Sequence, residues 1–281
     1  MNNSIIVVGG SGYLGKAIIK TLSSNSIEVT CADIVQPEGI NVPFIKYDIL
    51  NNKNVDLNKY NVIINCTGQI TKPIESCLLQ NSIGIINLLK NINPKTYLIQ
   101  ISTVGVYGTK PYALEEDNVN PETAYSTAKS ISEKIIINTL NSNSYIILRL
   151  CNLYGENQTK GVLAYLKRSY QSDLLLDFNH NGNLLRSFLH VNDCAKTIYS
   201  LISDYSNTRG IFNLSTHDTY TIKELVKLVE QIKEIKYTTA WKNNLPWENI
   251  EEISIKKIIN QISFKPEKNL ITFIKETFTK E

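Results

Sequence analysis

A tyrosine and a lysine four residues apart could carry out acid–base chemistry in this chain. Tyr125 and Lys129 stand in the run Tyr-Ser-Thr-Ala-Lys, and on a helix this spacing puts both side chains on one face, one turn apart. A phenol has a pKa of about 10 and is a poor base at neutral pH, but a neighbouring ammonium favours the phenolate and lowers that pKa. The pair could therefore move a proton to or from a carbinol oxygen. A solvated helix face can show the same spacing, so the interpretation depends on the rest of the chain.

A second group of residues could bind a phosphate. Residues 4–8 form a short apolar, β-branched run, as expected of a buried strand, and residues 16–22 read as a helix. Glycine is suited to the loop between them because a tight turn must bring backbone N–H groups against a pyrophosphate, where the helix N-terminus adds positive charge. An ordinary strand-to-helix turn is the alternative. The loop contains Gly9, Gly10, Ser11, Gly12, Tyr13, Leu14 and Gly15.

An acidic residue follows the next expected strand, residues 28–32. Asp33 lies 18 positions after Gly15, where a carboxylate can accept hydrogen bonds from the adenosine ribose hydroxyls and repel a 2′-phosphate. This position favours NAD over NADP, although a turn at the strand end could also place an aspartate here. Residues 44–49 look like a third strand, in which Asp48 would meet the edge of the adenine.

The elements that must position these groups alternate between strand and helix. Strands are expected at residues 61–68, 96–102 and 145–150, with helices at 74–90, around Tyr125, at 161–170 and at 222–233. The asparagine-rich crossover at 50–60 predicts a stunted helix. This alternation predicts an α/β fold with a Rossmann-type doubly wound parallel sheet, whose ligands bind beyond the carboxyl ends of the strands.

Composition excludes several other classes of protein. The 281 residues are 42% hydrophobic and 20% charged, with a net charge of only +3, which argues against nucleic acid or a membrane as the main partner. The five cysteines form no C-x-x-C pair, which favours reduced, buried thiols. Three scattered histidines do not suggest a metal site. No apolar run approaches 18 residues and no signal peptide is evident, so we expect a soluble, cytoplasmic protein.

Taken together and in this order, the motifs resemble those of the extended short-chain dehydrogenase/reductases, of the NAD-dependent sugar epimerase/dehydratase type. The resemblance runs nearly from end to end and does not rest on one motif. Besides the glycine loop, Asp33, Asp48 and the Tyr125–Lys129 pair, it includes Asn81-x-x-Gly84, Thr103 before Val106-Tyr107-Gly108, Arg149-Leu150-Cys151-Asn152, residues 186–193 (R-S-F-L-H-V-N-D), residues 212–215 (F-N-L-S) and residues 263–266 (S-F-K-P).

The resemblance implies a role for each matching position. Tyr125 would be the general acid/base and Thr103 would bond the same sugar oxygen, while Lys129 would bind the nicotinamide ribose and lower the pKa of Tyr125. Asn152 and Arg186, with Thr103, would bind the nucleotide-sugar substrate. NAD would be held by Tyr125 and Lys129 and by Gly9, Gly12, Tyr13, Leu14, Gly15, Asp33, Ile34, Asp48, Ile49, Cys66, Thr67, Gly68, Asn81 and Cys151.

Several of these residues also have purely structural interpretations. Thr103 could cap a strand end, Asn81 could cap a helix and Asn152 could form a turn. Arg186 could form a surface ion pair. No metal site is expected.

Two departures from the family pattern bear on the reaction. Dehydratases of the family follow the threonine with acidic residues, whereas Val104 and Gly105 follow Thr103 here, which disfavours dehydration. The second phosphate-binding arginine common near the family's C-terminus is also missing. Lys242 could substitute as a point charge, without the planar fork of an arginine.

The resemblance further implies a domain division and an activity. Residues 1–157 would form the NAD-binding domain, with returning segments near 187–214, and residues 158–281 would form mainly a small, interleaved substrate-binding region. The activity expected is a nucleotide-sugar 4-epimerase that acts through a transient keto-sugar. The alternatives are an NAD(P)H-dependent keto-deoxysugar nucleotide reductase or dehydrogenase and, more remotely, a non-catalytic NAD-sensing scaffold. A homodimer is expected.

Overall fold

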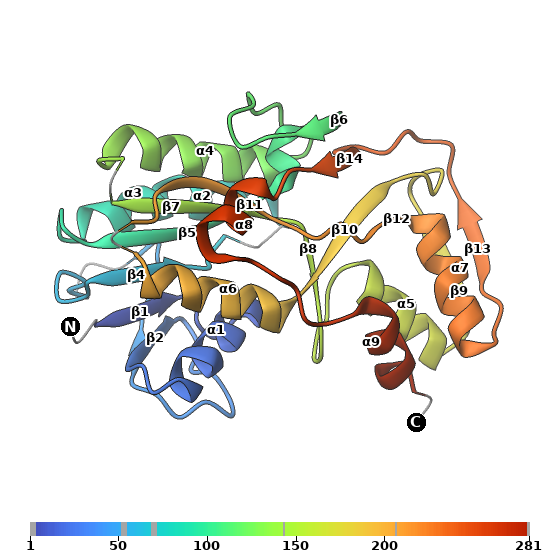
Figure 1. Ribbon diagram of the computed structural model, residues 1–281, viewed down its shortest axis with the longest axis horizontal. Coiled ribbons are helices and arrows are strands. Elements are labelled where there is room, and N and C mark those ends of the chain that lie inside the picture. Colours follow the sequence, from blue (N-terminus) through green and yellow to red (C-terminus); the bar gives the residue numbers. More distant parts are fainter. Residues whose placement is uncertain (1–3, 52–54, 69–71, 143, 206, 280–281) are drawn as a thin grey trace.

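A seven-stranded parallel sheet forms the centre of the protein (Figure 1). The computed structural model describes residues 4–51, 55–68, 72–142, 144–205 and 207–279. Every neighbouring pair of strands in this sheet is parallel, which confirms the predicted fold class. In order across the sheet the strands are β11 (Gly210–Leu214), β7 (Tyr145–Leu150), β5 (Tyr97–Thr103), β4 (Val62–Asn65), β1 (Ile5–Val8), β2 (Val29–Asp33) and β3 (Phe44–Lys46).

Helices cover both faces of the sheet, which is why its central strands are apolar on both sides. Successive residues of β1 point to opposite faces. Ile5 and Val7 therefore belong to one hydrophobic core, while Ile6 and Val8 belong to another. The first core lies under α1 (Tyr13–Ser24) and α6 (Val191–Ser203), and the second lies under α3 (Ile83–Lys90) and α4 (Ala124–Thr139), with α2 (Ile74–Asn81) on the same side of the sheet (Figure 1).

Several predicted elements differ from the observed ones, including the strand expected at 61–68, which is observed only at Val62–Asn65. The helix expected at 74–90 is broken at Ser82, whose hydroxyl donates to the Leu78 carbonyl at 2.6 Å, a side-chain bond that competes with regular helix. The strand expected at 44–49 ends at Lys46 because its partner β2 ends at Asp33. The helix after the glycine loop starts at Tyr13 rather than at 16. The described part of the 50–60 crossover contains no helix, and residues 52–54 lie outside it.

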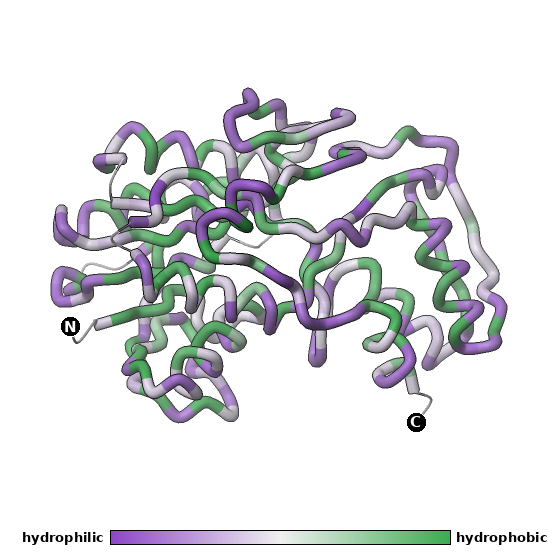
Figure 2. The backbone as a smooth tube through the Cα atoms, viewed as in Figure 1, coloured by the Kyte–Doolittle hydropathy of each residue, from purple (hydrophilic) through white to green (hydrophobic). Residues whose placement is uncertain are grey.

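A smaller body stands beside the carboxyl edge of the large sheet (Figure 1). Its own hydrophobic core includes Tyr154, Leu166, Phe188, Leu225 and Phe273. Hydrophobic residues follow its inward-facing segments as they follow the strands of the large sheet, while the outer loops are polar (Figure 2). Its elements are β8 (Asn152–Tyr154), α5 (Val162–Gln171), β9 (Leu175–Phe178), β10 (Leu185–His190), β12 (Thr219–Thr221), α7 (Ile222–Lys233), β13 (Thr238–Trp241) and α9 (Leu270–Thr277).

The chain passes repeatedly between the two bodies. After β10 it returns to the large body as α6 and β11, and β11 pairs with β7 at the sheet edge. It returns a second time after β13, and this returning segment pairs with a strand in the loops above the sheet. The elements of the second return are β14 (Ile250–Ile253), which pairs with β6 (Lys110–Ala113), and α8 (Lys256–Ile262).

Some predicted properties can be compared directly with the structure. All five cysteines are free and buried, as predicted. Within the described residues, no helix is long and apolar enough to cross a membrane. Among the same described residues, no three His, Cys, Asp or Glu side chains are grouped so that they could hold a metal ion.

Candidate functional site

A cavity of about 630 Å³ opens at the carboxyl ends of the central strands, where parallel α/β sheets bind their ligands. We call it the main cavity. It brings together residues that directly follow β1 and β4 with residues of α1, β5, α4 and β7, which are far apart in sequence. Its lining includes these predicted site residues: Gly9, Gly12, Tyr13, Leu14, Gly15, Cys66, Thr103, Tyr125, Cys151 and Asn152.

The glycine loop is folded tightly against itself at the floor of this cavity. Gly9 has a φ of 78°, a conformation that L side chains rarely adopt. A side chain on Gly15 would place its Cβ only 2.3 Å from the Gly9 carbonyl oxygen. The buried hydroxyl of Tyr13 has no hydrogen-bond partner among the described residues. The Tyr13 hydroxyl lies beside Gly155, and the backbone loop at the N-terminus of α1 alone fits the pyrophosphate of a dinucleotide.

Asp33 is oriented by the same loop. Its carboxylate accepts hydrogen bonds from the backbone N–H groups of Ser11 at 3.0 Å and Ile34 at 2.7 Å. These bonds hold a negative charge at the end of β2, where the adenosine ribose of a dinucleotide lies in such folds. The side chain of Ile34 is 60% exposed and therefore available to a ligand.

We expect Asp33→Asn to raise the affinity for NADP by about tenfold or more, because it removes the charge that repels a 2′-phosphate. The asparagine oxygen can still accept from the Ser11 N–H group, so the loop should persist. Isothermal titration with NAD and NADP measures the change, and Asp56→Asn on the surface serves as the matched control. If the unmodified protein bound both dinucleotides equally, Asp33 would have no role in the choice.

Two further predicted cofactor residues lie away from the main cavity. Asp48 is exposed and accepts a hydrogen bond from the Leu50 N–H group at 2.9 Å. Ile49 is buried in the second hydrophobic core, where its side chain would lie 3.0 Å from a Cβ built on Gly84. The structure thus packs Ile49 within the protein and leaves Asp48 at the surface.

The helix that carries the tyrosine and the lysine begins with a capping box. Thr123 and Ser126 exchange hydrogen bonds between side chain and backbone, which satisfies the free N–H groups of the first turn. Tyr125 follows in that turn, half-buried at the wall of the main cavity. Lys129 lies one turn further on, with Nζ 6.0 Å from the centre of the Tyr125 ring. The predicted i, i+4 arrangement on one helix is therefore observed.

Lys129 is completely buried beneath the site. Its ammonium donates to the carbonyl oxygens of Thr67 at 2.9 Å and Ile101 at 3.2 Å, so it links α4 to the ends of β4 and β5. Burial lowers the pKa of Lys129 to about 8, because a low-dielectric interior disfavours its charged form.

This burial predicts a pH dependence of stability for the cofactor-free protein. Between about 8, the pKa in the folded state, and the usual 10.5, the unfolded chain binds a proton that the folded chain does not. We expect the free energy of unfolding, relative to that of Lys129→Met, to be constant below pH 8 and to rise from there towards pH 10.5. Urea titrations of both proteins measure it, and pH profiles that stay parallel would contradict it.

Thr103 ends β5 and lines the main cavity. Its hydroxyl oxygen accepts a hydrogen bond from the Gly105 N–H group at 3.1 Å and caps the short helix η1 (Val104–Tyr107). The structural interpretation of this threonine is thus correct. It does not oppose a role at the substrate, because the hydroxyl hydrogen is not used in that bond.

The two cysteines at the cavity wall contribute apolar surface. Burial raises the pKa of Cys66 and that of Cys151 to about 12, so both remain thiols at neutral pH. Asn81 supports the same wall from α2, where its amide donates to the carbonyl oxygens of Gly68 at 3.0 Å and Cys77 at 2.9 Å. Any side chain on Gly68 would collide with Asn81, since its Cβ would lie 2.5 Å from the Asn81 amide oxygen.

A smaller cavity of about 190 Å³, the side cavity, adjoins the first at Thr103, Tyr125, Cys151 and Asn152. Arg186 lines only this one, and its guanidinium donates to the carbonyl oxygens of Leu185 at 2.9 Å and Glu248 at 2.8 Å. No ion pair of Arg186 occurs within the described residues, which removes the alternative of a surface ion pair. The Asn152 amide donates to the Ser187 carbonyl oxygen at 3.4 Å.

Lys242, the lysine considered as a substitute for the missing arginine, lies outside both cavities. Lys242 donates to the side chain of Asn179 at 2.8 Å at the surface. The neighbouring Trp241 stacks on Phe178 of β9, with ring centres 4.6 Å apart.

A buried ion pair supports the site from below. Arg149 Nη2 in β7 lies 2.7 Å from Glu133 Oε2 in α4, and both side chains are almost inaccessible to solvent. Ser102 also donates to the Glu133 carboxylate. The Arg149 guanidinium lies 4.7 Å from the ring centre of Tyr107. This network joins α4 to the strand ends that carry Thr103 and Cys151.

One carboxylate at the site belongs to none of the sequence motifs. Glu248, in the loop before β14, lines the side cavity together with Thr103, Tyr125 and Arg186. No carboxylate follows Thr103 in the sequence, the feature that disfavours dehydration, but the fold brings the carboxylate of Glu248 near Thr103 from a distant segment. The only local signal for it was Gly105, whose missing side chain leaves the necessary space.

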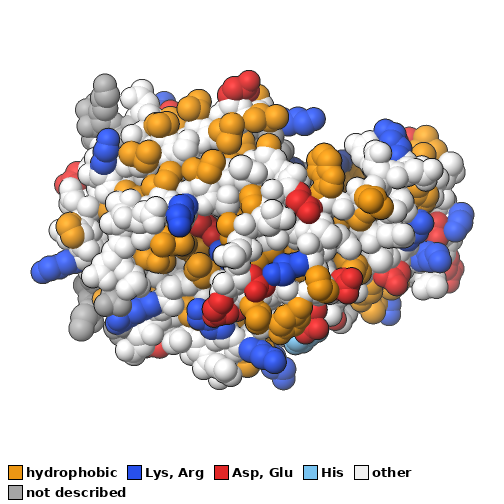
Figure 3. Space-filling model, turned by 90° about the horizontal axis from the view of Figure 1, so that it is seen from above, with side chains coloured by type: hydrophobic (Ala, Val, Ile, Leu, Met, Phe, Trp, Pro, Cys, Tyr) orange, Lys and Arg blue, Asp and Glu red, His pale blue; other side chains and the backbone are white. Residues whose placement is uncertain are grey.

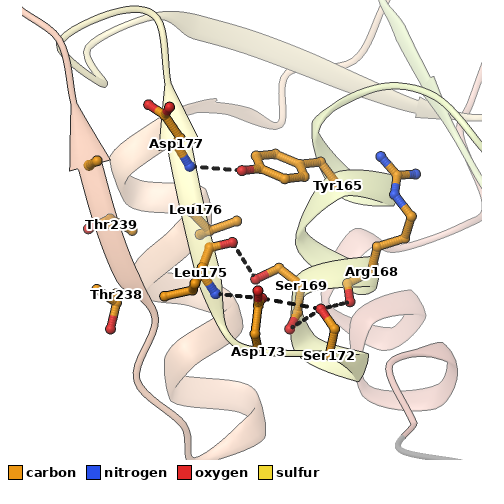
Figure 4. Close-up of a pocket in the computed structure, with 11 residues that line it drawn as sticks. Tyr165, Arg168, Ser169, Ser172, Asp173, Leu175, Leu176, Asp177, Thr238 and Thr239 are labelled. Carbon is orange, nitrogen blue, oxygen red and sulfur yellow. Dashed lines mark hydrogen bonds between the residues drawn. The ribbon is translucent and has the colours of Figure 1, made fainter.

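A second hollow, of about 640 Å³, lies between α5, β9 and β13, in the smaller body (Figure 4). Its polar groups mostly satisfy one another. The Tyr165 hydroxyl accepts from the Asp177 N–H group at 2.8 Å, and the Ser169 hydroxyl donates to the Leu175 carbonyl oxygen at 2.8 Å. None of the predicted site residues lines this hollow.

A doubly wound sheet with a glycine loop, an acidic residue after β2 and a Tyr–Lys helix at its carboxyl edge defines an oxidoreductase of the extended short-chain type. Residues 5–215 match the model of the NAD dependent epimerase/dehydratase family. The chain belongs to this family, as its resemblance predicted, and is an enzyme whose cofactor is NAD.

Similar proteins carry out several reactions. GDP-6-deoxy-D-talose 4-dehydrogenase of Aggregatibacter actinomycetemcomitans is 28% identical, over 81% of this chain and 79% of that protein. A putative UDP-glucose 4-epimerase of Methanocaldococcus jannaschii is 26% identical, over 80% and 81%. The structure of UDP-glucuronic acid 4-epimerase from Bacillus cereus, solved with UDP-glucuronic acid and NAD, aligns over 98% of both chains with a TM-score of 0.83 at 22% identity.

Proposed function

We propose that this enzyme is a nucleotide-sugar 4-epimerase that acts through a transient keto-sugar and retains its NAD. The supporting observation is that Thr103 and Tyr125 share one cavity with the glycine loop, so that a sugar and the nicotinamide can meet there. The similarity to a putative UDP-glucose 4-epimerase supports the same reaction.

In this proposal each residue has a separate task. Tyr125, as the phenolate, takes the proton of the sugar hydroxyl and later returns it, while the hydroxyl hydrogen of Thr103 bonds the same sugar oxygen. Lys129 holds a positive charge one turn below Tyr125, and Asn152 and Arg186 bind the nucleotide portion. Bound NAD supplies the hydride acceptor and donor. The cavity wall of Cys66, Leu150 and Cys151 limits the access of water to the reacting carbon.

A one-way dehydrogenase or keto-deoxysugar nucleotide reductase is the second candidate function. The similarity to GDP-6-deoxy-D-talose 4-dehydrogenase specifically supports it. The same Tyr125, Lys129 and Thr103 would act, but the cofactor would leave after each turnover.

The retained cofactor distinguishes the two candidates. Protein purified without added nucleotide is denatured, and the released small molecules are identified by mass spectrometry. About one NAD per chain supports the epimerase, whereas an empty protein that binds NAD reversibly supports the dehydrogenase or reductase. A co-purified nucleotide sugar would identify the substrate class. A protein that holds NAD but converts no nucleotide sugar would leave the non-catalytic scaffold as the explanation.

We also propose a homodimer formed through the helices on one face of the sheet. Hydrophobic side chains gather over the large body when the molecule is seen from above (Figure 3). The exposed ones on α2, α3 and α4 are Ile74, Leu78, Leu79, Ile83 and Ile137, with exposed fractions of 36–51%. Adjacent apolar residues of this kind are typical of a subunit interface.

Multi-angle light scattering should therefore give the mass of a dimer. The substitution Ile83→Asp should convert it to a monomer, because an aspartate at a packed interface is desolvated without a partner. Leu245→Asp, at a residue that is 78% exposed in a loop before β14, is the matched control and should leave the mass unchanged. An unmodified protein that is monomeric at micromolar concentrations would contradict the proposal.

A further inference from the structure

The carboxylate of Glu248 extends into the side cavity beside Thr103. A methyl group built on Gly105 would stand 2.7 Å from Oε2 of Glu248 and 3.4 Å from the hydroxyl oxygen of Thr103. Both oxygens therefore border the same small space, and Tyr125 lines the cavity that contains it. A side chain at position 105 would fill this space, so the glycine is required for the carboxylate to be there.

The two oxygens of this carboxylate have different surroundings. Oε1 accepts hydrogen bonds from the hydroxyls of Thr123, at 2.6 Å, and Ser126, the two residues that cap the Tyr125 helix. Oε2 has no hydrogen-bond donor among the described residues. Glu248 also makes no ion pair with any described residue. The Arg186 guanidinium donates to the backbone carbonyl oxygen of Glu248 and not to its carboxylate. One oxygen is thus fixed in place and the other is left for a ligand.

The backbone holds Glu248 in this position. Its φ of 54° lies in the left-handed region, which costs energy for a residue with a side chain. The strained turn is kept by bonds on both sides: the Glu122 carboxylate accepts from the Glu248 N–H group, and the Asn249 N–H group donates to the Thr109 hydroxyl at 3.1 Å. The carboxylate is therefore preorganised rather than mobile.

We propose that Glu248 is a specificity-determining residue: its Oε2 accepts a hydrogen bond from a hydroxyl of the sugar and repels a carboxylate brought to the same point. This rests on the proposed nucleotide-sugar activity, and it assigns the substrate to the neutral sugars rather than to the uronic acids. A sugar hydroxyl is a donor and satisfies Oε2, whereas a sugar carboxylate would place two like charges in a small, partly buried cavity. Like-charge contacts of this kind strongly disfavour the wrong partner.

The test compares matched nucleotide sugars that differ only at C6, where one carries a hydroxymethyl group and the other a carboxylate. UDP-glucose with UDP-glucuronic acid, and GDP-mannose with GDP-mannuronic acid, are titrated calorimetrically into the NAD-loaded enzyme. We expect the neutral member of the preferred pair to bind at least about tenfold more tightly. Glu248→Gln should reduce this preference to less than about threefold, since the amide carries no charge.

Two further variants make the result specific. Glu252→Gln removes the same charge from an exposed position in β14 and should keep the preference of the unmodified enzyme. Gly105→Ala leaves the glutamate but displaces its carboxylate, so it should weaken binding of the neutral sugar and reduce the preference as well.

The outcomes separate this inference from the function on which it rests. Equal binding of both members of a pair, or a preference unchanged in Glu248→Gln and in Gly105→Ala, would overturn the inference and leave the proposed function intact. Failure of every nucleotide sugar to bind would overturn both. A variant that no longer binds NAD as the unmodified protein does would be misfolded, and the other variant then decides.

Discussion

Replacing Tyr125 by phenylalanine should lower kcat about 10²–10⁴-fold, the usual contribution of a general acid/base. The hydroxyl is the only group removed, and the ring still fills the wall of the main cavity. Lys129 keeps its bonds to the Thr67 and Ile101 carbonyl oxygens, so the cofactor side of the site should persist. NAD affinity should therefore change by no more than a few-fold.

Steady-state kinetics with a nucleotide sugar that the unmodified enzyme converts gives kcat, and calorimetry gives the NAD affinity. Tyr165→Phe is the matched control, because it removes a phenol hydroxyl from the hollow of similar volume in the smaller body (Figure 4). It should leave kcat unchanged. If Tyr125→Phe kept full activity, the enzymatic role given to this helix would be wrong.

Replacing Glu133 by alanine should destabilise the protein by about 3–5 kcal/mol, the usual cost of leaving a buried charge without its partner. The guanidinium of Arg149 would then be enclosed between β7 and α4 with its bonds to Glu133, at 2.7–3.2 Å, removed. The Ser102 hydroxyl would lose its acceptor as well. Such a loss is a large fraction of the total stability of a typical domain, about 5–15 kcal/mol.

Urea unfolding followed by circular dichroism measures this change. The double variant Glu133→Met/Arg149→Met should recover much of the loss, because it removes both charges and keeps most of the volume. Glu267→Ala breaks an exposed ion pair with Lys196 and should have no measurable effect. A single variant as stable as the unmodified protein would mean that water or another group compensates Arg149.

Local sequence was sufficient for the elements that are apolar on both faces and for the loop that glycine requires. Residues 4–8 read as a buried strand because successive side chains enter two different cores, and β1 does so. The i, i+4 spacing of Tyr125 and Lys129 needed only a helix, which α4 provides. The boundaries of α7, residues 222–233, were also predicted correctly, since a Thr–Glu capping box begins it.

Features that depend on contacts between distant segments could not be predicted. The break at Ser82 follows from local side-chain bonds and from Asn81 reaching across to Gly68, and the latter contact needs the folded chain. The presence of Glu248 at the site could not be predicted for the same reason. Nothing in its own segment resembles a catalytic motif, and only the pairing of β14 with β6 and the space over Gly105 bring it to Thr103.

The order of the strands also affects how the protein folds during its synthesis on the ribosome. Strand β11 completes the large sheet and α6 completes one of its faces, yet both are translated after β8, α5, β9 and β10 of the smaller body. Until residue 214 has emerged, β7 is an open edge and part of the core beneath α1 is uncovered. Exposed edges and cores of this kind favour aggregation and attract chaperones. The nascent chain therefore cannot finish the large body before it has begun the smaller one, and the two bodies are expected to acquire their native structure together.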